Sequence, residues 1–133
     1  MSTRYLVVGG GMTGDAAVKA LRRADPEGAV TLVSLETRAP YKRPPLSKGL
    51  WKGESVDRVG LGTDATGANL LLGRRAVALD VEGASVQLDD GSIVPYDYLL
   101  LATGARARSL PALEGLESVV PYRTWSDYQL VKE

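Results

Sequence analysis

The chain has 133 residues, with 16 Lys and Arg balanced by 16 Asp and Glu, and it contains neither Cys nor His. A chain of this length forms one domain at most, and its zero net charge gives no field for nucleic acid or an anionic membrane, so we expect neither as a partner. The missing Cys and His exclude disulfides, thiolate nucleophiles, Cys/His zinc sites and Ser–His catalysis, and we expect no metal site.

The first predicted elements, over residues 5–36, are a strand, a tight turn, a helix and a second parallel strand. Residues 5–8 are apolar without alternation, which is typical of a strand buried on both faces of a parallel sheet. This run is too short for a signal peptide, and no later stretch is long enough to span a membrane. We therefore expect a cytoplasmic protein.

The turn after this strand carries glycines with the spacing G-x-G-x-x-G. We expect a sharp turn at Gly9, close approach of a pyrophosphate at Gly11 and close helix-to-strand packing at Gly14, because each position lacks a Cβ. The helix that follows is predicted to end at residues 25–28, with its apolar side chains on one face and Lys19 mostly on the other. Its first N–H groups would face the phosphates.

The second strand is predicted over residues 29–35, and Glu36 stands at its carboxyl end, 22 residues after Gly14. An acidic side chain at this distance accepts hydrogen bonds from the ribose hydroxyls of an adenine dinucleotide and would repel a 2′-phosphate. The combination favours a dinucleotide site over a plain strand–turn–helix connection. It does not distinguish FAD from NAD(P).

The loop at residues 37–49 contains three prolines and four basic residues. One interpretation is a solvated connection that the prolines make stiff. The other is that Arg43 and Lys48 are directed at the negatively charged pyrophosphate. We favour the second, because rigid prolines beside cations suit a site whose geometry must be held.

The remaining elements are shorter. We expect strands at residues 74–80 and 98–102 and an antiparallel hairpin over residues 81–94. The strand at 98–102 is apolar throughout, and we expect it to be buried on both faces. A short helix is predicted from Trp125, with Thr124 as its N-cap.

Four motifs, in this order, resemble the FAD domain of ferredoxin-reductase-type flavoproteins of the pyridine nucleotide-disulfide oxidoreductase superfamily. They are the glycine turn at 9–14, Glu36, the run P-Y-K-R-P-P-L-S-K at 40–48 and the run Y-L-L-L-A-T-G at 98–104. The resemblance covers nearly the whole chain. It implies an α/β, Rossmann-like FAD/NAD(P)-binding fold of three layers (ββα), in which a parallel sheet is joined by an antiparallel β-meander.

The resemblance also implies that this fold is incomplete. Residues 1–133 would form the N-terminal portion of an FAD-binding domain, without the NAD(P)H-binding and C-terminal interface domains of a full-length enzyme. Such a truncated chain is expected to bind FAD weakly, if at all, and to have no turnover alone. The exposed edge of its last strand could support a homo-oligomer.

Roles for single residues follow from the same resemblance. Lys48 would be the catalytic cation, near the reactive N5 edge of the flavin, and Ala76 would contact the adenine through its backbone. Thr103 and Gly104 would belong to a second flavin-binding motif, with a simple strand-ending turn as the alternative, and Arg123 would reach the pyrophosphate unless it is an ordinary surface residue. The full set of expected FAD-binding residues is Gly9, Gly11, Met12, Thr13, Gly14, Leu35, Glu36, Arg43, Pro44, Lys48, Ala76, Ala102, Thr103, Gly104 and Arg123.

The implied function is that of an FAD-dependent reductase, which takes electrons from NAD(P)H and passes them through FAD to a ferredoxin-type or similar acceptor. The run Ser47-Lys48-Gly49 stands where related enzymes carry a redox cysteine, which argues against a disulfide reductase. Two alternatives stay open. A non-catalytic NAD(H)-binding Rossmann module would explain the glycines and Glu36, and an interaction fragment would carry the nucleotide motifs only as vestiges.

Overall fold

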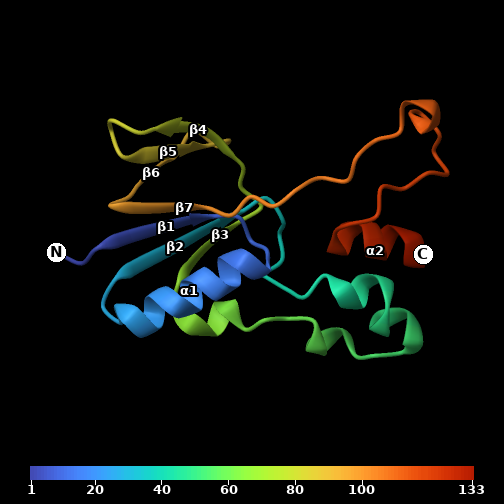
Figure 1. Cartoon of the computed structure of the whole chain (residues 1–133), viewed down its shortest axis with the longest axis horizontal. Coiled ribbons are helices and arrows are strands. Elements are labelled where there is room, and N and C mark those ends of the chain that lie inside the picture. The colour runs from blue at the N-terminus through green and yellow to red at the C-terminus, as the bar shows by residue number, and fades with distance from the viewer. The chain divides into compact units, whose positions relative to one another are not determined.

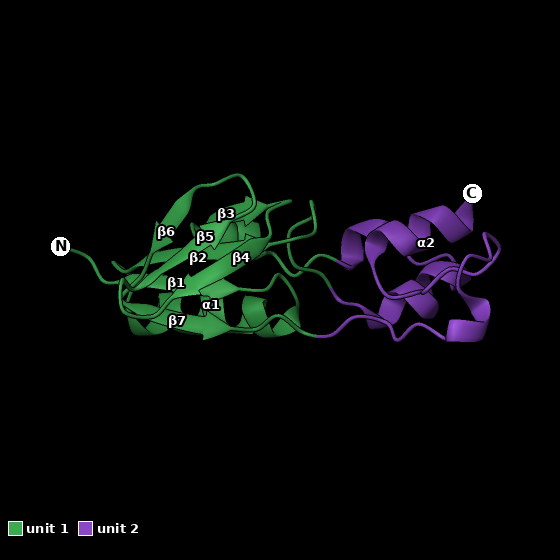
Figure 2. Ribbon diagram, turned by 90° about the horizontal axis from the view of Figure 1, so that it is seen from above, with its two compact units in different colours: residues 1–41, 60–104 green, residues 42–59, 105–133 purple.

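The computed structural model of the protein describes residues 1–133, which divide into two compact units. Unit 1 comprises residues 1–41 and 60–104, and unit 2 comprises residues 42–59 and 105–133 (Figure 2). The chain leaves unit 1 after Tyr41 and returns to it at Gly60, and an antiparallel bridge pairs these two residues.

Unit 1 is built on a four-stranded parallel sheet in the order β3-β2-β1-β7, with strands β1 (Arg4–Val8), β2 (Ala29–Ser34), β3 (Asn69–Leu72) and β7 (Tyr98–Leu101). The helix α1 (Met12–Ala24) makes the crossover from β1 to β2. All four strands run in the same direction, so their carboxyl ends meet at one edge of the sheet.

A second, antiparallel sheet has the order β4-β5-β6 and consists of β4 (Ala76–Asp80), β5 (Ser85–Leu88) and β6 (Ile93–Pro95). It covers one face of the parallel sheet, while α1 covers the other (Figure 1). The predicted three-layer α/β fold with an antiparallel meander is therefore confirmed.

Alternation along β1 explains how the two cores form. Leu6 and Val8 point to the meander and pack in one buried cluster with Val86. Val7 lies between them in sequence, points to the opposite face and packs with Val18 of α1. A strand with a core on each face must be apolar at successive positions, as β1 is over residues 5–8.

Two predictions about strands need correction. The sequence pattern did not predict β3, which forms one edge of the parallel sheet. It also predicted that the strand at 98–102 is buried on both faces, and this is wrong, because Tyr98 is 65% exposed and Leu101 is 59% exposed. The physical reason is that β7 is the other outer strand of the sheet and has a neighbour only on the β1 side.

Unit 2 consists of short 3-10 turns and one helix, α2 (Trp125–Lys132). The turns in it are η1 (Pro44–Ser47), η2 (Gly49–Lys52), η3 (Val56–Arg58) and η5 (Pro111–Leu113), whereas η4 (Thr63–Thr66) belongs to unit 1. The predicted cap of α2 is confirmed: the Thr124 hydroxyl accepts a hydrogen bond from the Asp127 N–H, and the Asp127 carboxylate accepts one from the Thr124 N–H.

Aromatic side chains join the two halves of unit 2. The Trp51 ring of η2 meets the Tyr128 ring of α2 edge-on, with 5.4 Å between the ring centres. The Trp51 indole N–H donates to the carbonyl of Leu46 at 2.7 Å.

No helix of the chain combines the length and the apolar character that a membrane span needs.

Candidate dinucleotide-binding site

The turn between β1 and α1 is held by its own glycines. Gly9 has a φ of +129°, and a Cβ at this position would lie 1.9 Å from the carbonyl oxygen of Ala102. The Gly9 N–H donates to the carbonyl of Val33 at 2.8 Å. The turn therefore sits between the ends of β2 and β7, and its conformation and packing both require glycine.

Gly14 and Gly10 are also required by packing within the protein. A Cβ on Gly14 would lie 2.0 Å from the carbonyl oxygen of Gly9, which confirms the predicted close approach of helix and strand. A Cβ on Gly10 would lie 2.2 Å from the hydroxyl oxygen of Ser34, a contact that the spacing of the glycines did not indicate.

Gly11 differs from these three glycines. Its φ is −90°, which any residue can adopt, and a Cβ there would have no atom of the protein within 4 Å. It is the N-cap of α1 and has no side chain to cap the helix. The first N–H groups of an α-helix have no partner within the helix, and the dipole makes that end positive. The space beside Gly11 therefore fits an anionic group such as a pyrophosphate, and a side chain would fill it.

Glu36 lies two residues beyond the end of β2 and is fixed through both its main chain and its side chain. Its carbonyl accepts a hydrogen bond from the Gly73 N–H at 3.0 Å, and its N–H donates to the Ser34 hydroxyl at 3.3 Å. Its carboxylate accepts a hydrogen bond from the Tyr41 hydroxyl at 2.5 Å. The side chain is half-buried and so stays accessible to a ligand.

The other predicted residues of unit 1 lie at the same edge of the parallel sheet, where the carboxyl ends of its strands meet. Ala102 continues β7, since its N–H donates to the carbonyl of Val8 at 2.8 Å, and Thr103 and Gly104 come next. Ala76 opens β4, a few residues after the end of β3. The structure thus gathers at the carboxyl ends of the parallel strands Gly9, Gly11, Met12, Thr13, Gly14, Leu35, Glu36, Ala76, Ala102, Thr103 and Gly104.

Four predicted residues belong to unit 2. The Arg43 guanidinium donates to the carbonyl oxygen of Arg123 at 3.2 Å, so the structure brings these two residues together across a long stretch of sequence. Pro44 is the first residue of η1, and Lys48 follows its last residue and is exposed. Their predicted roles beside FAD stay predictions.

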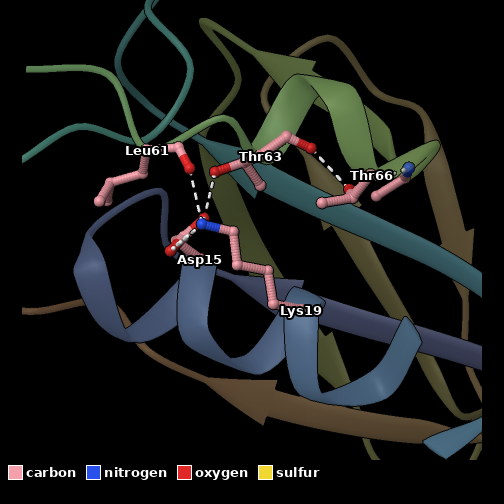
Figure 3. A network of polar contacts seen from close by, with 6 residues as sticks. Asp15, Lys19, Leu61, Thr63 and Thr66 are labelled. Atoms are coloured by element: carbon pink, nitrogen blue, oxygen red, sulfur yellow. Dashed lines mark hydrogen bonds and ion pairs between the residues drawn. The ribbon is translucent and has the colours of Figure 1, made fainter. Parts of the chain in front are cut away.

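A buried polar network on α1 was missed by the sequence analysis (Figure 3). Asp15 is only 6% exposed, and its carboxylate accepts hydrogen bonds from the hydroxyl of the fully buried Thr63 at 2.7 Å and from the Lys19 ammonium at 3.0 Å. Lys19 also donates to the carbonyl of Leu61 at 2.6 Å, so this residue, which the sequence placed mostly on the face opposite the apolar side chains, contacts the loop before η4. The spacing of Asp15 and Lys19 predicts an ion pair, but no local pattern indicates Thr63.

This network ties the loop around η4 to the first turns of α1. Lys19 neutralises Asp15, so the carboxylate adds little repulsion for an anion at the helix start. The network therefore fixes the helix whose N-terminus faces the space beside Gly11.

Fold and site together define a Rossmann-type dinucleotide-binding protein, with a glycine turn between β1 and α1 and an acidic residue after β2. The match to known families is more specific. Residues 3–133 match the family described as pyridine nucleotide-disulphide oxidoreductase, and the chain belongs to it.

Relatives in this family are reductase components of oxygenase systems. The chain is 34% identical to the ferredoxin–NAD(+) reductase subunit of a benzene 1,2-dioxygenase system from Pseudomonas putida, over 100% of this chain and 34% of the relative. It is 37% identical to the ferredoxin reductase component of a chlorobenzene dioxygenase from Cupriavidus sp. (strain PS12), over 96% of this chain and 32% of the relative. The name of the first relative includes ferredoxin and NAD(+), which agrees with the acceptor and the nicotinamide cofactor that the sequence led us to expect.

Solved structures agree with these relatives. The covalent putidaredoxin reductase–putidaredoxin complex matches with a TM-score of 0.86 at 30% identity, over 98% of this chain and 33% of that one. The ferredoxin reductase for the CYP199A2 system from Rhodopseudomonas palustris matches with a TM-score of 0.87 at 31% identity, over 98% and 34%. The chain thus spans about one third of the length of the relatives it matches.

Proposed function

We propose that residues 1–133 form the N-terminal part of the FAD-binding domain of an NAD(P)H-dependent ferredoxin reductase. The observation that carries this proposal is the space beside Gly11, where a glycine stands although neither packing nor conformation of the protein requires one. A pyrophosphate that approaches the start of α1 would explain why position 11 has no side chain. The relatives named ferredoxin–NAD(+) reductases support the reaction.

Each group of residues has a part in this proposal. The turn from Gly9 to Gly14 would hold the pyrophosphate with the N–H groups of α1, and Glu36 would accept hydrogen bonds from the adenosine ribose. Arg43 and Arg123, which contact each other in unit 2, would neutralise phosphate charge. Lys48 would place a positive charge at the flavin edge. FAD, when bound, supplies the chemistry that accepts a hydride and releases single electrons.

The proposal extends to partners. The structural neighbour in which a reductase is linked to putidaredoxin supports a ferredoxin-type acceptor for a protein of this kind. We also propose a cytoplasmic location and self-association of the chain through the outer edge of β7, where apolar side chains are exposed.

Two neighbouring glycine substitutions test the FAD site. Gly11→Ala adds a methyl group to open space, so we expect the folded chain to keep its stability within about 1 kcal/mol, while FAD affinity falls by about tenfold or more because the methyl group occupies the place of the pyrophosphate. Gly10→Ala is the comparison variant, because its methyl group would collide with Ser34 and lower the stability, which Gly11→Ala should not do. Flavin fluorescence gives the affinity, and urea unfolding gives the stability.

Two outcomes would contradict the proposal. Undiminished FAD binding by Gly11→Ala would show that the space beside Gly11 is not the pyrophosphate site. Failure of the unsubstituted chain to bind FAD, together with tight binding of NADH, would favour the non-catalytic NAD(H) module.

A further inference from the structure

Tyr41 is a buried tyrosine whose hydroxyl reaches the residue expected to bind ribose. Its side chain is 2% exposed, and its hydroxyl donates to Oε2 of Glu36 at 2.5 Å. We propose that Tyr41 is a positioning residue that orients the Glu36 carboxylate toward the adenosine ribose of FAD. The inference rests on the proposed function, because it assigns a second residue to the same ribose subsite.

The Tyr41 hydroxyl acts on the side chain of Glu36, whereas other groups hold its main chain. Its main chain is already held by hydrogen bonds with Gly73 and Ser34. A glutamate side chain has several rotatable bonds, and a ligand that fixes them must overcome the lost rotamer freedom. A carboxylate has about four acceptor positions, of which the Tyr41 hydroxyl takes one.

Tyr41 is itself held rigidly. Its backbone forms the antiparallel bridge with Gly60, and beside this bridge the Leu61 N–H donates to the carbonyl of Pro40 at 3.2 Å. The same Leu61 accepts a hydrogen bond from Lys19 of α1 through its carbonyl. The pair of segments at 40–41 and 60–61 is therefore connected both to the ribose carboxylate and to the helix that starts at the phosphate turn.

A purely structural role makes a different prediction. A buried hydroxyl needs an acceptor, and Glu36 could serve only to satisfy Tyr41. Loss of the hydroxyl would then weaken the binding of every ligand to the same degree. A positioning role instead links the hydroxyl to the ribose alone, so its loss should matter only for a ligand that carries ribose hydroxyls.

The experiment compares FAD with an analogue in which the adenosine is 2′,3′-dideoxyadenosine, and measures both dissociation constants by flavin fluorescence. We expect the unsubstituted chain to bind FAD about tenfold more tightly than the analogue, since the analogue leaves Glu36 without its hydroxyl partners. In Tyr41→Phe we expect FAD affinity to fall about fivefold and affinity for the analogue to change by less than about twofold.

Two controls distinguish a positioning role of Tyr41 from an effect of its hydroxyl on the stability of the fold. Tyr5→Phe removes a hydroxyl that donates to Asp25 at 3.1 Å, in the same unit but at the amino end of β1, and it should leave the preference for FAD unchanged. In a Glu36→Ala background, Tyr41→Phe should have no further effect on either ligand. Both proteins in this second comparison carry Glu36→Ala, so the comparison holds even when Tyr41→Phe lowers the stability of the fold.

Equal losses for both ligands in Tyr41→Phe would overturn the inference and leave the FAD site in place. An unsubstituted chain that binds FAD and the analogue equally would overturn it too, since Glu36 would then have no role at the ribose. Tight binding of NADH by the unsubstituted chain, together with no binding of FAD or of the analogue, would overturn the proposed function and this inference with it.

Discussion

Among single residues, Asp97 makes the clearest link between an ionisable group and the fold. Its carboxylate accepts hydrogen bonds from the Arg4 guanidinium at 2.7 Å and from the Arg4 N–H at 2.7 Å, while the Asp97 N–H donates to the carbonyl of Arg4 at 2.9 Å. Arg4 opens β1, and Asp97 immediately precedes β7. These contacts therefore hold the amino ends of two neighbouring parallel strands in register.

We predict that this pair contributes to stability in a pH-dependent way. The hydrogen bond from the Arg4 guanidinium lowers the pKa of Asp97 from its ordinary 3.8 to about 2. A lowered folded-state pKa gives a contribution that is complete above about pH 4 and is lost as the pH falls toward 2. The Asp97→Asn variant should thus show a lower urea midpoint at pH 7 and a weaker fall of that midpoint between pH 4 and 2.

The reciprocal variant, Arg4→Met, removes the same interaction from the other side and should flatten the same part of the pH profile. The measurement is the urea midpoint of all three proteins across this range. If Asp97→Asn keeps the full pH dependence of the unsubstituted chain, other carboxylates determine it.

The glycine turn shows how far single residues could be predicted from the sequence. The roles of Gly9 and Gly14 were predicted correctly, because a G-x-G-x-x-G turn encodes its own backbone contacts at short range. The need for glycine at position 10 was not predicted, since the atom it avoids belongs to Ser34 on another strand. The Tyr41–Glu36 hydrogen bond also could not be predicted from the sequence, because no pattern indicates where a side chain in an irregular loop will point.

At the scale of elements, the Asp15 network predicts how the η4 loop is attached to α1. Thr63→Val keeps the shape of the side chain and removes the hydroxyl that donates to Asp15. The buried carboxylate would then keep only Lys19, so we expect unfolding free energy to fall by about 1–3 kcal/mol. Urea unfolding at neutral pH measures this change.

Thr31→Val is the matched control for this prediction. It makes the same chemical change in β2, between Val30 and Leu32, which pack toward α1, so alternation places Thr31 on the opposite face of the sheet. We expect a change within about 0.5 kcal/mol there. A Thr63→Val effect no larger than that of Thr31→Val would show that the buried hydroxyl does not hold the loop.

The elements themselves were predictable to different degrees. The succession β1–α1–β2 was predicted, because its apolar runs and glycines lie within one local pattern. The strand β3 was missed, because its few apolar residues lie between an irregular segment and Gly73 and show no alternation. The burial of β7 was predicted wrongly, because an apolar run indicates a strand but does not say whether a neighbour lies on both of its sides.

At the scale of the whole molecule, the outer edge of β7 is the most exposed apolar feature of the parallel sheet. Tyr98, Leu100 and Leu101 are 65%, 41% and 59% exposed. Beside them, a cavity of about 270 Å³ between β7 and α1 is lined by side chains that include Tyr5, Ala17 and Leu21. An unpaired strand edge with apolar side chains favours pairing with another chain.

We therefore predict that the chain associates with itself in solution through β7, in a manner that depends on concentration. Leu101→Lys places a charge on this edge, which is how natural proteins prevent such pairing, and should shift the chain toward the monomer. Val81→Lys is the matched control, because Val81 is 73% exposed and lies outside the parallel sheet, after β4. Sedimentation equilibrium over a wide concentration range measures the mass of all three proteins. A monomeric mass for the unsubstituted chain at the highest concentration, or equal effects of the two substitutions, would show that the β7 edge does not mediate association.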